Sequence, residues 1–98
     1  MNVAAYESTG VPKVASGWSL HGESDMSDLM HKETGRIFVV NRVGRRVIEM
    51  CDGRRTVADI VQGLTREFNK VSVERVSRDV HRFLEEASKR GLIESANI

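Results

Sequence analysis

The sequence predicts an α+β domain of winged helix-turn-helix character, in which a three-stranded antiparallel sheet is followed by three helices. Two observations support this fold class. Short β-branched and aromatic runs, separated by turn residues, occur in residues 1–40. Beyond them, apolar residues recur at helical spacing, and each run is preceded by a residue that can cap a helix. With 98 residues, the chain is long enough for one domain with a modest core.

Residues 1–25 are expected to form an N-terminal extension that is partly disordered. They are rich in Gly, Ser and Ala and offer little apolar surface to bury, so we expect residues 1–10 to fray. Weak alternation at Val14, Trp18 and Leu20 is nevertheless compatible with a short first strand at the sheet edge. The folded domain proper is therefore expected over residues 26–98.

A β-hairpin is predicted from residues 28–31 and 36–40, which flank a four-residue loop that ends in Gly35. Glycine at this point can take a positive φ at little cost, as hairpin loops often require. Residues 37–40 form a continuous β-branched and aromatic run. Such a run is typical of a strand that is buried on more than one side.

Two helices are predicted next. Asn41 is a good N-cap for a helix over residues 42–51, which Asp52 and Gly53 end. Thr56, with Asp59 three residues later, has the pattern of a capping box that opens the second helix. The apolar positions of the first helix are Val43, Val47, Ile48 and Cys51, and those of the second are Val57, Ile60, Val61, Leu64 and Phe68.

The third helix is predicted to start after Ser72 and to end at Gly91. Leu92 and Ile93 can then return as a short extended segment. The apolar stripe of this helix falls within roughly 100° of arc at 3.6 residues per turn. It consists of Val73, Val76, Val80, Phe83, Leu84 and Ala87.

Composition and charge exclude several classes of protein. The chain has fifteen basic and fourteen acidic residues, so no overall field favours nucleic acid or membrane as a partner. There is no signal-peptide pattern and no apolar stretch of bilayer length. The single cysteine cannot form an internal disulfide, which suits a reducing compartment. We therefore expect a cytoplasmic protein.

The residues give little support for catalysis. The three histidines lack metal-ligand spacing with one another or with Cys51, so no metal site is expected. Cys51 lies among apolar helix positions, where a buried structural thiol is favoured over a nucleophile. No glycine-rich phosphate loop is present. The chain is therefore interpreted as a non-enzyme without a cofactor.

Basic residues on the third helix suggest an alternative function. Arg75, Arg78, Arg82 and Lys89 form a stripe, and the third helix of a winged helix-turn-helix protein reads DNA. However, carboxylates flank the stripe and can form i,i+4 pairs, namely Glu74–Arg78, Glu85–Lys89 and Glu86–Arg90. A solvent-exposed face of this helix with several salt bridges is therefore favoured, and a DNA-binding regulator is kept as the alternative.

At a larger scale, the order of several short motifs resembles the PqqD-like family, which is named for the pyrroloquinoline quinone synthesis protein D. The resemblance covers about residues 26–94. It rests on residues 38–41, Gly44, residues 51–53 and 56–60, and then on Asp79, Val80, Phe83, Leu84 and residues 91–93. The resemblance implies three strands followed by three helices, as the pattern of the residues does.

The resemblance also implies a non-catalytic peptide chaperone. Such a protein binds the leader of a ribosomally made precursor peptide and presents it to a modifying enzyme, often a radical SAM protein. In the family the peptide lies between the third strand and the third helix. The candidate peptide-binding residues here are Arg36, Ile37, Phe38, Val39, Val40, Arg75, Asp79, Arg82, Phe83 and Glu86.

Physical reasoning points the same way. A three-stranded sheet in a small domain has exposed edges, and an open edge beside an apolar groove suits β-strand addition by a peptide. The neighbouring arginines would favour a peptide that carries Asp or Glu. The same open edge could also pair two copies of the chain, so a monomer and a homodimer are both compatible with the sequence.

Overall fold

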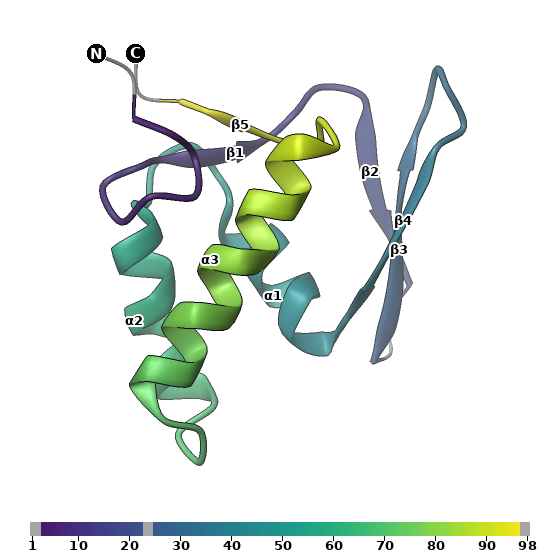
Figure 1. The fold of residues 1–98 in the computed structure, drawn as a ribbon. Helices are drawn as coiled ribbons and strands as arrows, with labels where there is room; N and C mark the ends of the chain where they lie inside the picture. The colour runs from purple at the N-terminus through teal and green to yellow at the C-terminus, as the bar shows by residue number, and fades with distance from the viewer. Residues whose placement is uncertain (1–2, 23–24, 97–98) are drawn as a thin grey trace.

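The computed structural model describes residues 3–22 and 25–96. It confirms the predicted α+β class, because a three-stranded antiparallel sheet of order β2-β3-β4 precedes three helices (Figure 1). A second, two-stranded sheet joins β1 to β5. The elements in order are β1 (Pro12–Val14), β2 (Trp18–His21), β3 (Met26–His31), β4 (Ile37–Asn41), α1 (Arg42–Met50), α2 (Val57–Glu67), α3 (Val73–Lys89) and β5 (Ile93–Ser95).

The predicted hairpin is confirmed as β3 and β4, with Gly35 at φ 73° in the loop. Side chains alternate between the two faces of the sheet along each strand, and only one of these faces is buried. Val40 points inward and is 3% exposed, whereas Ile37 and Val39 point outward and are 58% and 55% exposed. The prediction that this run is buried on more than one side is therefore wrong.

The N-terminal segment is packed more closely than its composition suggested. Ala5 is buried, and the carbonyls of Ser8 and Gly10 accept hydrogen bonds from the first turn of α2 at 3.0 and 2.9 Å. Those helix N–H groups have no partner within the helix. The backbone carbonyls of the N-terminal segment supply the missing acceptors, and the small residues there allow the close approach. For residues 3–10, the expectation of little to bury is wrong, while residues 1–2 lie outside the described residues. The domain boundary after residue 25 stays a prediction.

The expected first strand is divided in two. Gly17, at φ 96°, separates β1 from β2, and the two strands enter different sheets. β2 pairs with β3, with Leu20 opposite Leu29, as a first strand of the main sheet should. β1 instead pairs with β5, the short extended segment predicted after Gly91. The extension therefore contributes to both sheets.

All three predicted N-caps are confirmed. Asn41 Oδ1 accepts the Gly44 N–H at 2.9 Å, and Ser72 Oγ accepts the Arg75 N–H at 3.2 Å. Thr56 and Asp59 form the reciprocal capping box, with both hydrogen bonds at 3.1 Å. These bonds satisfy N–H groups that the first turn of a helix cannot satisfy itself. Each helix consequently starts at the residue that the sequence indicated.

The core is a single cluster of residues from the main sheet, the three helices and β5, and it contains most of the predicted apolar stripes. Cys51 is buried there, and burial raises the pKa of its thiol to about 12, as for an unreactive structural cysteine. Val43 and Val73 differ from the prediction, since they are 38% and 54% exposed. Each stands in the first turn of its helix and lines a surface hollow instead of the core.

Within residues 3–22 and 25–96, no helix is both long enough and apolar enough to cross a bilayer. In the same residues, no three His, Cys, Asp or Glu side chains are grouped closely enough to hold a metal ion.

Candidate functional site

The main sheet has two edge strands, β2 and β4, with β3 between them, and β4 is the edge strand that leads directly into α1. The direction of its backbone groups follows from the hairpin register. The His31 N–H donates to the Arg36 carbonyl at 2.9 Å, and these two residues continue the register of the β3–β4 pairs. In an antiparallel ladder, hydrogen-bonded and non-hydrogen-bonded pairs alternate. Phe38 and Val40 therefore bond to β3, whereas the N–H and C=O groups of Ile37 and Val39 point toward the open edge.

Aromatic and arginine side chains connect β4 to the C-terminal half of α3. The rings of Phe38 and Phe83 meet edge to face, with centroids 6.2 Å apart. The Arg90 guanidinium lies over the Phe38 ring at 5.2 Å, and Arg36 Nη2 donates to the Arg90 carbonyl at 3.0 Å. These contacts fix α3 beside the strand whose edge is open.

Beyond Phe83, a groove with a volume of about 340 Å³ runs between α1 and α3. We call it the α1–α3 groove. One wall consists of Asn41, Val43, Gly44 and Val47, and the other of Arg75, Asp79, Val80 and Phe83.

Gly44 determines how closely the two walls approach. A Cβ atom at this position would lie 3.2 Å from the Phe83 ring and 3.2 Å from Val40 Cβ, which is tighter than ordinary van der Waals contact. Glycine inside a helix costs about 1 kcal/mol relative to alanine, so a packing reason is expected. Here the reason is that α1 passes directly beside Phe83 at the head of the groove.

The structure brings together about half of the predicted site residues. Phe38 and Phe83 are in contact, and Arg75 and Asp79 line the groove as an exposed ion pair at 3.9 Å. Val40 supports Gly44 from within the core.

The other predicted residues lie around this centre or away from it. Ile37 and Val39 supply the open edge while their side chains point outward, and Arg36 lies at the far end near Arg90. Glu86 forms an ion pair with Arg90 at 3.0 Å. Arg82 lines a different hollow, beside residues 6–8 of the N-terminal segment.

Several groove residues were missed by the sequence reasoning, namely Asn41, Val43, Gly44 and Val47 from the end of β4 and from α1. The sequence could have indicated Gly44, because a glycine inside a helix weakens that helix and is therefore expected to serve packing or function. The valines carried none, since a helical apolar stripe is equally typical of a core.

Comparisons with known proteins agree with this geometry. The family model described as coenzyme PQQ synthesis protein D (PqqD) matches residues 29–93, about two-thirds of the chain. The chain belongs to the PqqD family. No curated protein sequence matches this PqqD-family chain.

Two solved structures share the fold of this PqqD-family chain. One is TbiB1 in complex with the TbiA(beta) leader peptide, with a TM-score of 0.72 and 26% identity over 84% of this chain and 94% of that one. The other is a lasso peptide synthetase B1 complexed with its leader peptide, with a TM-score of 0.72 and 17% identity over 85% and 96% of the two chains. The family resemblance predicted from the motifs is thereby confirmed.

The charges of α3 are partly paired, as expected. Of the three pairs predicted for this helix of the PqqD-family chain, Glu86–Arg90 is present. Among the described residues, Glu74–Arg78 and Glu85–Lys89 do not come within ion-pair distance, whereas Arg75–Asp79 does. The comparisons do not favour the alternative of a DNA-binding regulator.

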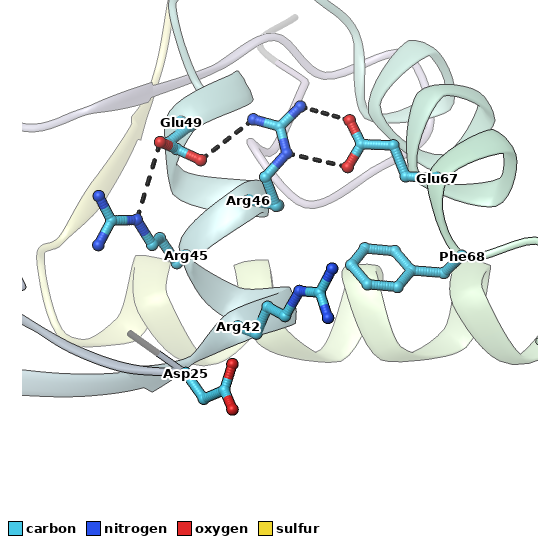
Figure 2. A pocket seen from close by; sticks show the side chains of 7 residues that line it. All are labelled: Asp25, Arg42, Arg45, Arg46, Glu49, Glu67 and Phe68. Atoms are coloured by element: carbon cyan, nitrogen blue, oxygen red, sulfur yellow. Dashed lines mark hydrogen bonds and ion pairs between the residues drawn. The ribbon is translucent and has the colours of Figure 1, made fainter. Parts of the chain in front are cut away.

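A cluster of charged side chains joins α1 to α2 (Figure 2). Arg46 binds the Glu67 carboxylate through two hydrogen bonds, of 2.9 and 2.5 Å, and reaches Glu49 at 3.1 Å. The hydrogen bonds from Arg46 hold the pKa of Glu67 below its usual range. Beside them, the Arg42 guanidinium lies over the Phe68 ring at 5.6 Å. These contacts hold α1, which forms one wall of the groove, against α2.

Glu67→Gln is expected to reduce the free energy of unfolding at neutral pH by less than about 1 kcal/mol, because both partners are more than a third exposed. A lowered folded-state pKa stabilises above the unfolded value of about 4.3, and the contribution is lost as the pH falls toward the folded value. Urea denaturation from neutral to acid pH should therefore show the difference between the two proteins shrinking below about pH 4.3. Glu85→Gln, which removes no ion pair in the described chain, is the control. A difference that stays constant with pH would contradict the assignment.

Proposed function

We propose that this chain is a non-catalytic recognition module for the leader of a ribosomally synthesised precursor peptide. The leader would add as a strand to β4 and would be presented to a modifying enzyme such as a radical SAM protein. One observation carries the proposal: the open edge of β4 ends at Asn41, which lines the groove between α1 and α3. It occurs in a PqqD-family fold whose similar solved structures are complexes with leader peptides.

Strand addition suits the chemistry of this edge. The N–H and C=O groups of Ile37 and Val39 would pair with the main chain of the peptide and supply affinity that depends little on sequence. Alternate peptide side chains would point toward the helices, where the groove selects among them. Selection would then come from Val43, Val47 and Phe83 at the base of the groove and from Arg75 at its rim.

A non-catalytic role is supported by the site residues themselves. The titratable groups that line the groove, Arg75 and Asp79, are exposed and paired with each other. The Cys51 thiol is buried, and its raised pKa keeps it protonated at neutral pH. Chemistry on the peptide would therefore belong to the partner enzyme. We place this activity in the cytoplasm and assign no cofactor to the chain.

Titration of ¹⁵N-labelled protein tests the proposal. Because the natural leader is unidentified, the probe is a peptide selected by the wild-type chain from a random display library, which we call the selected peptide. The largest amide shifts are expected in β4 and on the side of α3 that carries Arg75, Asp79 and Phe83. Shifts confined to α2, or specific duplex DNA binding at nanomolar affinity, would overturn the proposal.

Charge reversal at the rim probes the expected preference for acidic peptides. Arg75→Glu should weaken an acidic selected peptide about 1.4- to fivefold, the range of an exposed ion pair worth about 0.2–1 kcal/mol. The loss should be smaller at high salt, since exposed charges are screened. Isothermal titration calorimetry measures both effects. Arg66→Glu makes the same charge change on α2 outside the groove, and an equal loss there would count against a role for the rim.

A further inference from the structure

A second hollow opens where α1, α2 and α3 meet, and it differs from the groove in being almost wholly apolar. Its volume is about 240 Å³, and its apolar walls are Val43, Leu64, Phe68, Val71 and Val76. Leu64 is fully buried and forms the floor. Val43 and Val71, at 38% and 37% exposed, stand at the opening. Partly exposed apolar side chains around a buried floor form a site that another apolar group can fill.

The hollow adjoins the α1–α3 groove. Val43, Arg75 and Asp79 line both spaces. Asn41, the last residue of β4, lines the groove one position before α1 begins and two positions before Val43. A peptide paired with β4 that continues past Asn41 therefore passes over Val43 and reaches the hollow, with the Arg75–Asp79 ion pair along its path.

The size and lining of the hollow restrict its occupant. Sites for small molecules usually measure about 300–1,000 Å³ and hold several convergent polar groups. This hollow is smaller, and its polar groups are Arg75 and Asp79, which are exposed and paired with each other at 3.9 Å. A single large apolar side chain fits these properties, and a polar metabolite does not.

We propose that the hollow is a specificity pocket for one large apolar side chain, such as Leu, Met or Phe, of the peptide bound at β4. The inference rests on the proposed function and makes it more specific. The peptide is recognised at two places, by its main chain along β4 and by an apolar anchor beyond the Asn41 end. The first contact accepts many sequences, and the second selects among them.

Parallel selections from a random peptide display library test the anchor. The full chain is used as wild type and as Val71→Asp, which places a charge at the opening of the hollow. Val73→Asp is the matched control, because Val73 is exposed two positions further along the chain but lines a different hollow. Val71→Ser serves as a milder second variant, and circular dichroism checks the fold of each.

Wild type and Val73→Asp are expected to enrich peptides with a large apolar residue at one fixed position. Val71→Asp should lose this preference and still select peptides through β4. In calorimetry, replacing the anchor of a selected peptide by serine should cost wild type tenfold or more in affinity and cost Val71→Asp much less. Non-additive losses of this kind are expected when Val71 and the anchor side chain are in direct contact.

The outcomes separate the two proposals. If wild type selects no peptide, the proposed function fails and the anchor fails with it. If peptides are selected but Val71→Asp keeps the same apolar preference and the same loss on serine substitution, only the anchor pocket is overturned. Selected peptides without any fixed apolar position would also overturn the pocket and leave strand addition standing.

Discussion

Val39→Pro is expected to weaken binding of the selected peptide by at least about tenfold while the domain stays folded. The Val39 N–H points toward the open edge of β4, so proline removes a donor that the added strand needs and places its ring there. Leaving a buried partner unsatisfied costs about 1–3 kcal/mol, and the steric conflict adds to this cost. Proline is tolerated on edge strands where the missing N–H would face solvent. Calorimetry with the selected peptide, alongside thermal unfolding, measures both properties.

Two further variants serve as controls for this experiment. Val39→Ala keeps the N–H and removes most of an exposed side chain, so it should retain most of the affinity. Phe38→Pro removes an N–H that bonds to β3 and should destabilise the sheet itself. If Val39→Pro binds as tightly as wild type, the peptide does not pair with β4 and strand addition is the wrong mechanism.

Leu84→Ala is expected to lower the free energy of unfolding by about 2–5 kcal/mol. Leu84 lies in the middle of α3, is fully buried, and belongs to the one core that the sheet and the helices share. Truncation removes buried apolar surface and leaves a cavity that the surrounding backbone only partly fills. Because small domains are stable by only about 5–15 kcal/mol, this is a large fraction of the total. Urea denaturation should show a lower midpoint with an unchanged slope.

Val73→Ala is the control for this prediction, because the same helix carries Val73 in a position that is 54% exposed. Surface substitutions usually change stability by about 0.5 kcal/mol or less. A loss at Leu84 no larger than the loss at Val73 would mean that α3 does not pack on the core as described.

The sequence by itself determined the local structure of this chain and its family. Asn41, Thr56 with Asp59, and Ser72 each cap a helix through bonds that span three residues. Gly35 and Gly91 take positive φ where a loop and a helix end require it. Signals of this kind depend on a few adjacent residues, so they can be read without knowing the fold. The ordered set of such motifs was also sufficient to identify the PqqD family.

The tertiary structure alone decided which surfaces are free. Residues 37–40 have the composition of a strand buried on both faces, yet nothing in the described chain covers Ile37 and Val39. Val43 follows a helical apolar stripe and still opens onto the groove, while Arg82 turns toward the N-terminal segment. The physical reason is that periodicity reports which side of an element is apolar. Whether that side is covered depends on partners that are distant in sequence, here Phe83 against Gly44 and residues 3–10 against α2.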